Sequence, residues 1–345
     1  MTLSYKARRI WRRVGIAALI LLLAAVAALL VWFLWLDRFL IFSREGARLD
    51  FSLSPEVSQG QAAAAPPTEE SVDVVYNEGE NAVNTSTELA QLYGYYIDAQ
   101  ALTDLEALEE QVAAIPNGSA VMLDVKSIYG YCFYTTQSGT TADSVDVAGV
   151  DSLIAQLKSR NMYLIARMPA FQNFVFGLNN VDCGLPVEGG YLWMDGEGCY
   201  WLDPAASGTI NQLVQTVAEL KGLGFREVVF RQFCFPDMSS IVYDTSDLTG
   251  VLNTAAEKLV AACASSTFAV SFETELGAIT MPEGRVRQYV SGVSAVNVQR
   301  TAEESGLGEN AVSRLVFLSE SNDTRYDAYS VLRPVNMVLS TIPQQ

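Results

Sequence analysis

Charged side chains end several apolar, strand-like segments of this chain, and two of them are carboxylates. Asp124 closes the run 120–126, and Glu273 closes the run 267–273. Side chains alternate between the faces of a strand, so Asp124 shares a face with Met122, and Glu273 with Ser271. Cleavage of a glycosidic bond needs two carboxyl groups, one to protonate the leaving oxygen and one to act as nucleophile or base. Asp124 and Glu273 are therefore the predicted catalytic pair.

Other polar and aromatic side chains are predicted to surround this pair and contact a substrate. They are Lys126 on the face of Asp124, Arg167 at the end of segment 162–168, Arg231 and Gln232 in segment 227–233, Gln299 at the end of segment 294–299, and Trp201, whose ring could stack on a sugar. The alternative is that Arg and Lys neutralise each acid in a buried network that fixes geometry and does no chemistry.

Neither a metal nor a cofactor is expected at this site. The chain contains no histidine, which excludes histidine-dependent triads and histidine-ligated zinc. No glycine-rich phosphate loop follows the first strand, which argues against a dinucleotide-binding sheet. The five cysteines form no C-x-x-C pair, and most of them are expected to be small, buried apolar residues.

Alternating strands and helices position these residues. The pattern predicts strands at 92–98, 120–126, 162–168, 227–233, 267–273, 294–299, 314–318 and 329–335, and helices at 104–114, 150–160, 207–223, 248–265, 283–289 and 302–311, with Thr103 as the first helix cap. Such alternation indicates a (β/α)8 TIM-type barrel, in which chemistry lies at the carboxyl ends of the strands. The C-terminal part fits least well, so the barrel is expected to be incomplete there or to take its last strand from 329–335.

Charge divides the chain into regions. All 39 acidic residues follow residue 36, whereas residues 1–13 carry only basic charge. The uncharged segment 14–36 is long enough to cross a hydrocarbon core of about 30 Å, and the positive-inside rule keeps its N-terminus cytoplasmic. The sequence therefore predicts a basic cytoplasmic tail (1–13), a transmembrane signal anchor (14–36), an extracytoplasmic linker (37–88) and a barrel (89–338).

A cleaved signal peptide is the alternative to this anchor, but no small-x-small cleavage site follows Leu36. The predicted location is the cell membrane, with a single pass and the barrel outside the cytoplasm. The acidic surface of the remainder argues against nucleic acid as a partner, because both would be negatively charged.

Five segments occur in order along the chain: GYYID at Gly94, VMLDVKSIYG at Val121, MYLIARMPAF at Met162, YWLDP at Tyr200 and GFREVVFRQFCFPD at Gly224. Together they resemble the bacterial family of putative glycoside-hydrolase TIM-barrel domains, of the α-amylase-like clan. The resemblance implies that Asp124 and Lys126 are site residues, that Arg167 lies near the substrate and that Asp203 helps to close the long loop.

The fourth strand departs from the family pattern. Members of the family typically read G-F-D-E-I-x-F-D-Y-x-R-F-P, with the second Asp as the catalytic carboxylate, and this chain has Arg231 at that position. Arginine cannot act as a nucleophile or acid. Next to Asp124 and Glu273 it is expected to lower their pKa and remove the protonated acid that hydrolysis needs.

The sequence thus predicts a barrel of the bacterial cell envelope that binds polysaccharide or cell-wall glycan, with lost or altered catalysis. An active glycosidase that uses Asp124 and Glu273 is one alternative. An envelope-assembly scaffold without a sugar ligand is another.

Overall fold

The structure, a computed structural model, describes residues 40–43, 46–49 and 89–339, which belong to two separate units. In the first unit, β1 (Leu40–Ser43) and β2 (Gly46–Leu49) form an antiparallel hairpin within the segment expected to be a linker. The predicted membrane anchor at 14–36 lies outside the described residues. Within the described ranges, no helix has the length and apolar character needed to cross a membrane.

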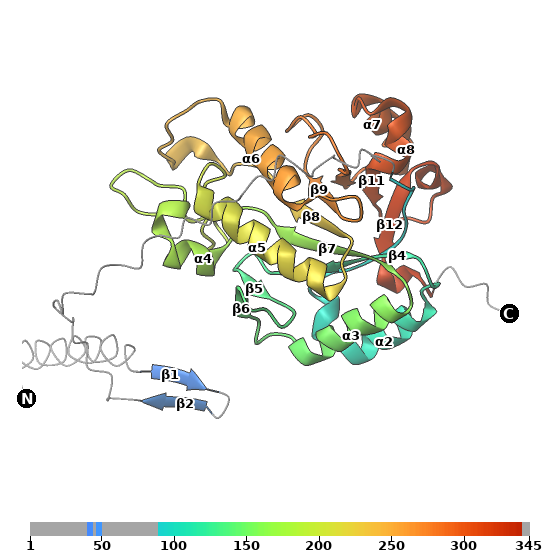
Figure 1. Cartoon of the computed structure of the whole chain (residues 1–345), viewed down its shortest axis with the longest axis horizontal. Coiled ribbons are helices and arrows are strands. Elements are labelled where there is room, and N and C mark those ends of the chain that lie inside the picture. The colour runs from blue at the N-terminus through green and yellow to red at the C-terminus, as the bar shows by residue number, and fades with distance from the viewer. Residues whose placement is uncertain (1–39, 44–45, 50–88, 340–345) are drawn as a thin grey trace, which may run out of the picture. The chain divides into compact units, whose positions relative to one another are not determined.

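The second unit contains a closed barrel of eight parallel strands (Figure 1). In order around the ring they are β3 (Tyr93–Ile97), β4 (Ala120–Asp124), β7 (Tyr163–Pro169), β8 (Glu227–Arg231), β9 (Ala269–Glu273), β10 (Gln288–Ser291), β11 (Leu315–Leu318) and β12 (Ser330–Pro334). The pairing of β12 with β3 closes the ring. The predicted TIM-type barrel is confirmed, and its eighth strand is present.

Helices follow most of the strands and cover the outside of the barrel (Figure 1). They are α2 (Leu105–Ala114), α3 (Val147–Ser159), α4 (Phe174–Asn179), α5 (Ser207–Leu223), α6 (Leu248–Cys263), α7 (Val298–Glu304) and α8 (Ala311–Arg314). An aspartate caps the start of α2, α3 and α6 by accepting a backbone N–H of the first turn. The cap of α2 is Asp104 rather than the predicted Thr103.

Two predictions in the C-terminal third are wrong. Residues 283–289, predicted as a helix, begin with a bend at 283–285 and lead into β10, and the backbone N–H of Phe272 in β9 donates to the carbonyl of Arg287. Residues 294–299, predicted as the sixth strand, form a 3₁₀ turn and the start of α7. Val298, Thr301 and Ala302 are buried at the spacing of one helix face, which is why this segment is helical.

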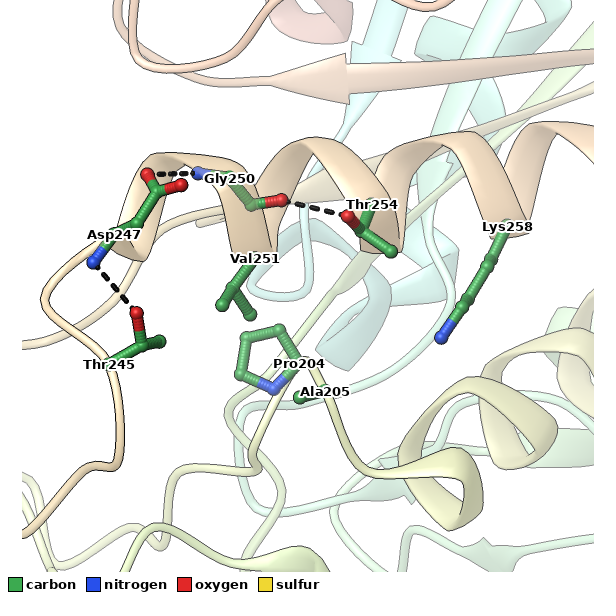
Figure 2. A pocket seen from close by; sticks show the side chains of 8 residues that line it. All are labelled: Pro204, Ala205, Thr245, Asp247, Gly250, Val251, Thr254 and Lys258. Carbon is green, nitrogen blue, oxygen red and sulfur yellow. Dashed lines mark hydrogen bonds between the residues drawn. The ribbon is translucent and has the colours of Figure 1, made fainter.

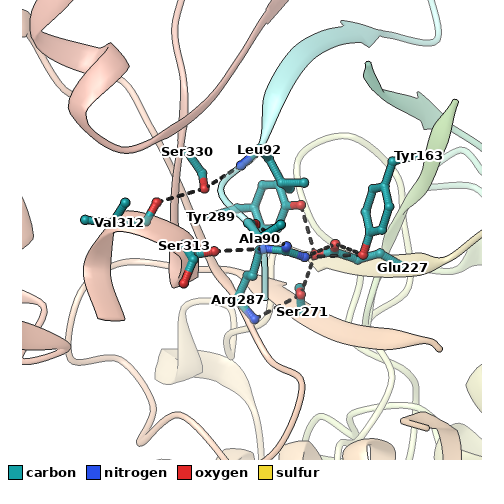
Figure 3. Close-up of polar contacts among 10 residues, drawn as sticks. All are labelled: Ala90, Leu92, Tyr163, Glu227, Ser271, Arg287, Tyr289, Val312, Ser313 and Ser330. Carbon is teal, nitrogen blue, oxygen red and sulfur yellow. Dashed lines mark hydrogen bonds and ion pairs between the residues drawn. The ribbon is translucent and has the colours of Figure 1, made fainter. Parts of the chain in front are cut away.

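The barrel interior is apolar at mid-height and carries a buried ion pair at the amino ends of the strands. Met122, Ile165, Val229, Val316 and Leu332 pack together inside the ring. Below them the side chains of Glu227 and Arg287 are 0% and 1% exposed and form an ion pair. Hydroxyl groups of Tyr163, Ser271 and Tyr289 donate to the same carboxylate (Figure 3). The amino-terminal end of the barrel is thus closed by a saturated polar cluster.

Candidate functional site

Four of the predicted site residues meet at the carboxyl ends of adjacent strands. Asp124 ends β4 and pairs in register with Arg167 of β7, and Arg231 ends β8 and pairs with Glu273 of β9. All four continue the inward-facing positions of their strands, above the apolar layer of the interior. The structure therefore assembles this part of the predicted site, which is called the barrel mouth below.

Asp124 is held by arginine on two sides. Its Oδ1 lies 2.6 Å from Nε of Arg167, and its Oδ2 accepts from Nη2 of the same guanidinium at 3.1 Å and from the backbone N–H of Ala99 at 3.1 Å. Nη1 of Arg231 lies 4.0 Å from Oδ2. With its side chain only 5% exposed, Asp124 is a charge-paired carboxylate whose two oxygens are both engaged.

Glu273 lies on the other side of Arg167 and is bound more loosely. Its Oε2 is 3.6 Å from Nη1 of Arg167, and this buried oxygen accepts no hydrogen bond from any described residue. Burial raises the pKa of Glu273, and this effect outweighs the opposing influence of Arg167 and Arg231. The expectation that Arg231 would leave no raised-pKa acid is therefore wrong for Glu273.

A cavity of about 590 Å³ opens beside these residues, between the exits of β3, β10 and β11. Its lining includes Arg167, Tyr96, Asp98 and Glu320, so it shares the guanidinium that holds both carboxylates. The Arg167 guanidinium carbon lies 6.0 Å from the centroid of the Tyr96 ring. Burial, followed by the charge of Glu320, raises the pKa of the Tyr96 hydroxyl, which keeps it a hydrogen-bond donor. The volume falls within the range of small-ligand sites.

Two further cavities lie away from the mouth. One of about 360 Å³ is lined by Pro204, Ala205 and residues of α6 such as Thr254 and Lys258 (Figure 2). The other, of about 600 Å³, lies at the amino ends of the strands next to Arg287. Neither is lined by Asp124, Arg167, Arg231 or Glu273.

Two predicted site residues lie elsewhere. Lys126 is 5% exposed, and the groups that act on its ammonium are the thiol of Cys132 and the carboxylate of Glu219 rather than Asp124. Strand β4 ends at Asp124, so the alternation that placed Lys126 in the mouth does not extend to it. Gln299 lies on α7 and donates to Glu303 at 2.9 Å on an exposed surface.

The remaining predicted residues lie in the segments that follow the strands around the mouth. Asp203 accepts from the Tyr243 hydroxyl at 2.6 Å. Trp201 is 7% exposed and its Nε1 donates to Asp195 at 2.7 Å, so the indole is packed rather than open for stacking. Gln232 follows Arg231 directly with a positive φ of 52°, a strained conformation for a residue with a side chain.

Asp195 is a structural residue that the sequence did not indicate. Its carboxylate accepts from Trp201, from Gln172 Nε2 at 2.7 Å, and from the backbone N–H groups of Glu197 and Cys199. Burial alone would raise the pKa of Asp195, but these hydrogen bonds lower it. They fix the long segment between β7 and α5. No group of three or more potential metal-binding Cys, Asp or Glu side chains occurs in the part of the chain that the structure describes.

A family model described as "putative glycosyl hydrolase domain" matches residues 94–270, just over half of the chain. The chain belongs to this family. The matched part of this glycosyl hydrolase domain contains Asp124, Arg167 and Arg231 and ends three residues before Glu273. No curated protein matches the chain.

Solved structures share the barrel at low sequence identity. An α-galactosidase from Lactobacillus brevis superposes with a TM-score of 0.50 at 12% identity, over 74% of this chain and 39% of that one. The GH36 α-galactosidase AgaA from Geobacillus stearothermophilus gives 0.50 at 11% identity, over 75% and 40%. The chain thus spans about two fifths of the length of these enzymes, and the likeness shows the fold alone. A hypothetical protein from Ruminiclostridium thermocellum is 21% identical, with a TM-score of 0.44, over 52% of this chain and 96% of that one.

Proposed function

We propose that this glycosyl hydrolase domain binds polysaccharide or cell-envelope glycan at the barrel mouth, with lost or altered hydrolysis. The proposal rests on one observation: Arg231 stands at the end of the fourth strand, 4.0 Å from Asp124. Hydrolysis needs a second carboxylate that is free to attack carbon or to activate water. The oxygens of Asp124 are instead occupied by Arg167, Ala99 and Arg231, so Asp124 is poorly suited to either role.

The same arrangement suits a neutral, hydroxyl-rich ligand. Arg231 remains 30% exposed, and guanidinium groups donate hydrogen bonds in a fixed fork. Oε2 of Glu273 offers an acceptor without a partner among the described residues, and Tyr96 offers a ring and a hydroxyl. Sugar hydroxyls both donate and accept, so they can pair with each of these groups. Family membership makes carbohydrate the expected class of ligand.

A second candidate function is an active glycosidase with Glu273 as the general acid. The raised pKa of Glu273 favours it, because a carboxyl group that stays protonated can donate to a leaving oxygen. Asp124 would then supply the second carboxylate in spite of its ion pairs.

We further propose that the barrel is held outside the cytoplasm of a bacterial cell by the apolar segment 14–36, with 37–88 as the linker. The basic residues before this segment and the absence of a cleavage site after it support this topology.

The test applies the purified full-length chain to a panel of immobilised polysaccharides and measures retention and new reducing ends together. Retention without new reducing ends is the result expected for binding, and Asp124→Asn and Glu273→Gln, which alter the mouth, should weaken that retention without producing reducing ends. New reducing ends that disappear in both variants would replace the binding proposal with the glycosidase. If no polysaccharide retains the chain and none yields new reducing ends, the binding and the glycosidase proposals are both contradicted, and the assembly scaffold remains. Glu304→Gln, on the exposed face of α7, is the matched control.

A further inference from the structure

Lys126 and Cys132 lie opposite each other in a short antiparallel pairing just after β4. Their bridge is flanked by two backbone hydrogen bonds of 2.9 Å, from Ser127 N–H to the Tyr131 carbonyl and from Phe133 N–H to the Val125 carbonyl. This pattern makes Lys126 and Cys132 a non-hydrogen-bonded pair, the kind in which opposite side chains lie closest. Their Cβ atoms are expected about 4.5–5.5 Å apart, on one face of the pairing.

Both side chains are buried, and the lysine ammonium makes no hydrogen bond to the part of the chain that the structure describes. Lys126 is 5% exposed and Cys132 is 2% exposed. Among the described residues, none forms a hydrogen bond or ion pair with the Lys126 ammonium, although the charge of Glu219 acts on it from further away. Burial lowers the pKa of Lys126 and raises the pKa of Cys132, so both groups tend toward their neutral forms. A neutral amine is a nucleophile, whereas an ammonium is not.

We propose that Lys126 and Cys132 are a modification site, at which peroxide joins the lysine nitrogen to the cysteine sulfur in a reversible cross-link. In the first step the thiol and hydrogen peroxide give a sulfenic acid and water. In the second, the amine attacks the sulfur, the S–O bond breaks, and the hydroxide leaves as water with a proton from the nitrogen. A dithiol reductant reverses the link by forming its own disulfide and returning the amine and the thiol.

The surroundings of the pair favour this reaction over further oxidation. Tyr134 and Thr136, which follow Cys132 in the chain, both donate their hydroxyl groups to Glu219, so these hydroxyl protons and the carboxylate are engaged with one another. A buried sulfenic acid at Cys132 would therefore meet the Lys126 amine as its neighbouring nucleophile. The link would tie the segment after Asp124 to the loop 131–142.

A second lysine near a cysteine provides an internal control. Nζ of Lys221 donates to the carbonyl oxygen of Cys263 at 2.5 Å and lies 4.8 Å from the centroid of the Phe268 ring. Both contacts stabilise a charged ammonium, which cannot attack sulfur. Lys221 and Cys263 should therefore remain unlinked under the same treatment.

The experiment treats the full-length chain with hydrogen peroxide, blocks free thiols, digests with trypsin and identifies peptides by mass spectrometry. The expected product is a single uncleaved peptide that contains both Lys126 and Cys132 and is lighter by two hydrogen atoms than the same peptide without the link. Trypsin should fail to cleave after Lys126, and dithiothreitol should restore cleavage. Lys126→Arg and Cys132→Ser should abolish the link, and the peptides of Lys221 and Cys263 should stay unlinked.

Two results would overturn the proposal. One is Cys132 carrying one or more added oxygen atoms, or remaining unoxidised, while cleavage after Lys126 is undiminished. The other is a link at Lys221 and Cys263 as abundant as that at Lys126 and Cys132, which would show that proximity alone suffices. Both can be read in the wild-type chain, so the test does not depend on whether the variants fold.

Discussion

The buried pair of Glu227 and Arg287 provides the sharpest test of the fold. In Glu227→Gln the volume is kept, but the guanidinium of Arg287, 1% exposed, loses its counter-charge. Breaking a buried pair from one side costs about 3–5 kcal/mol, because the remaining charge stays buried without compensation. Arg287 keeps its hydrogen bonds to the carbonyl oxygens of Ser313 and Ala90. We therefore expect a loss near the middle of that range, about 4 kcal/mol.

The measurement is urea unfolding at neutral pH, with the slope of the transition compared between variants. Replacing Glu227 and Arg287 together with Met should recover part of the loss, since no buried charge is then left alone. Glu304→Gln, which breaks the exposed pair with Arg300 on α7, should cost less than about 0.5 kcal/mol. A loss below about 1 kcal/mol in Glu227→Gln, or a double variant no more stable than the single one, would refute the reasoning.

Three further outcomes follow from the barrel wall and the mouth. Gly94→Ala should destabilise the fold by at least about 3 kcal/mol, because a Cβ there would lie 1.8 Å from the Ala120 carbonyl oxygen. Gly222→Ala in α5, where a Cβ meets open space, should be neutral or stabilising by up to about 1 kcal/mol, and urea unfolding of both variants measures the difference. The free energy of unfolding of Glu273→Gln, relative to wild type, should be higher at neutral pH than at acid pH. The raised pKa of Glu273 means that the fold disfavours its ionised form, and this cost to the wild type appears as the pH rises above 4.5. A stability advantage of the variant that grows on acidification would contradict the assignment. Arg231→Asp should raise the pKa of Glu273 further, because the charge of Arg231 lowers it. NMR titration of the side-chain carboxyl carbon of Glu273 measures this, and an unchanged pKa would contradict the prediction.

The sequence predicts those parts of this barrel in which local pattern and environment agree. Helix α5 has the predicted bounds, and the strands that carry Asp124, Arg167, Arg231 and Glu273 were located to within a few residues. Each is a short apolar run that ends in a charged residue, which is the pattern of a buried parallel strand with a polar exit. The four residues could therefore be assigned to one end of the barrel from sequence alone.

The sixth strand was misplaced because its inward-facing residue is an arginine. Val286, Gln288 and Val290 alternate with Arg287 and Tyr289 in the period of a strand, but a charged residue at a core position argues against burial when its partner is unknown. The partner, Glu227, lies 60 residues away on another strand. Only the tertiary structure brings the two charges together.

The two ends of the barrel use the same residue types in different ways. At the amino end, Glu227 is fully buried and accepts from Arg287 and from three hydroxyl groups, so it has nothing to offer a ligand. At the mouth, Oε2 of Glu273 accepts no hydrogen bond from a described residue, and Arg231 is 30% exposed. Buried acceptors are almost always paired in folded proteins, and in the proposed function a ligand hydroxyl is the partner of this one. In the proposed function, Arg231 is the donor that would meet a carbohydrate hydroxyl at this end of the barrel.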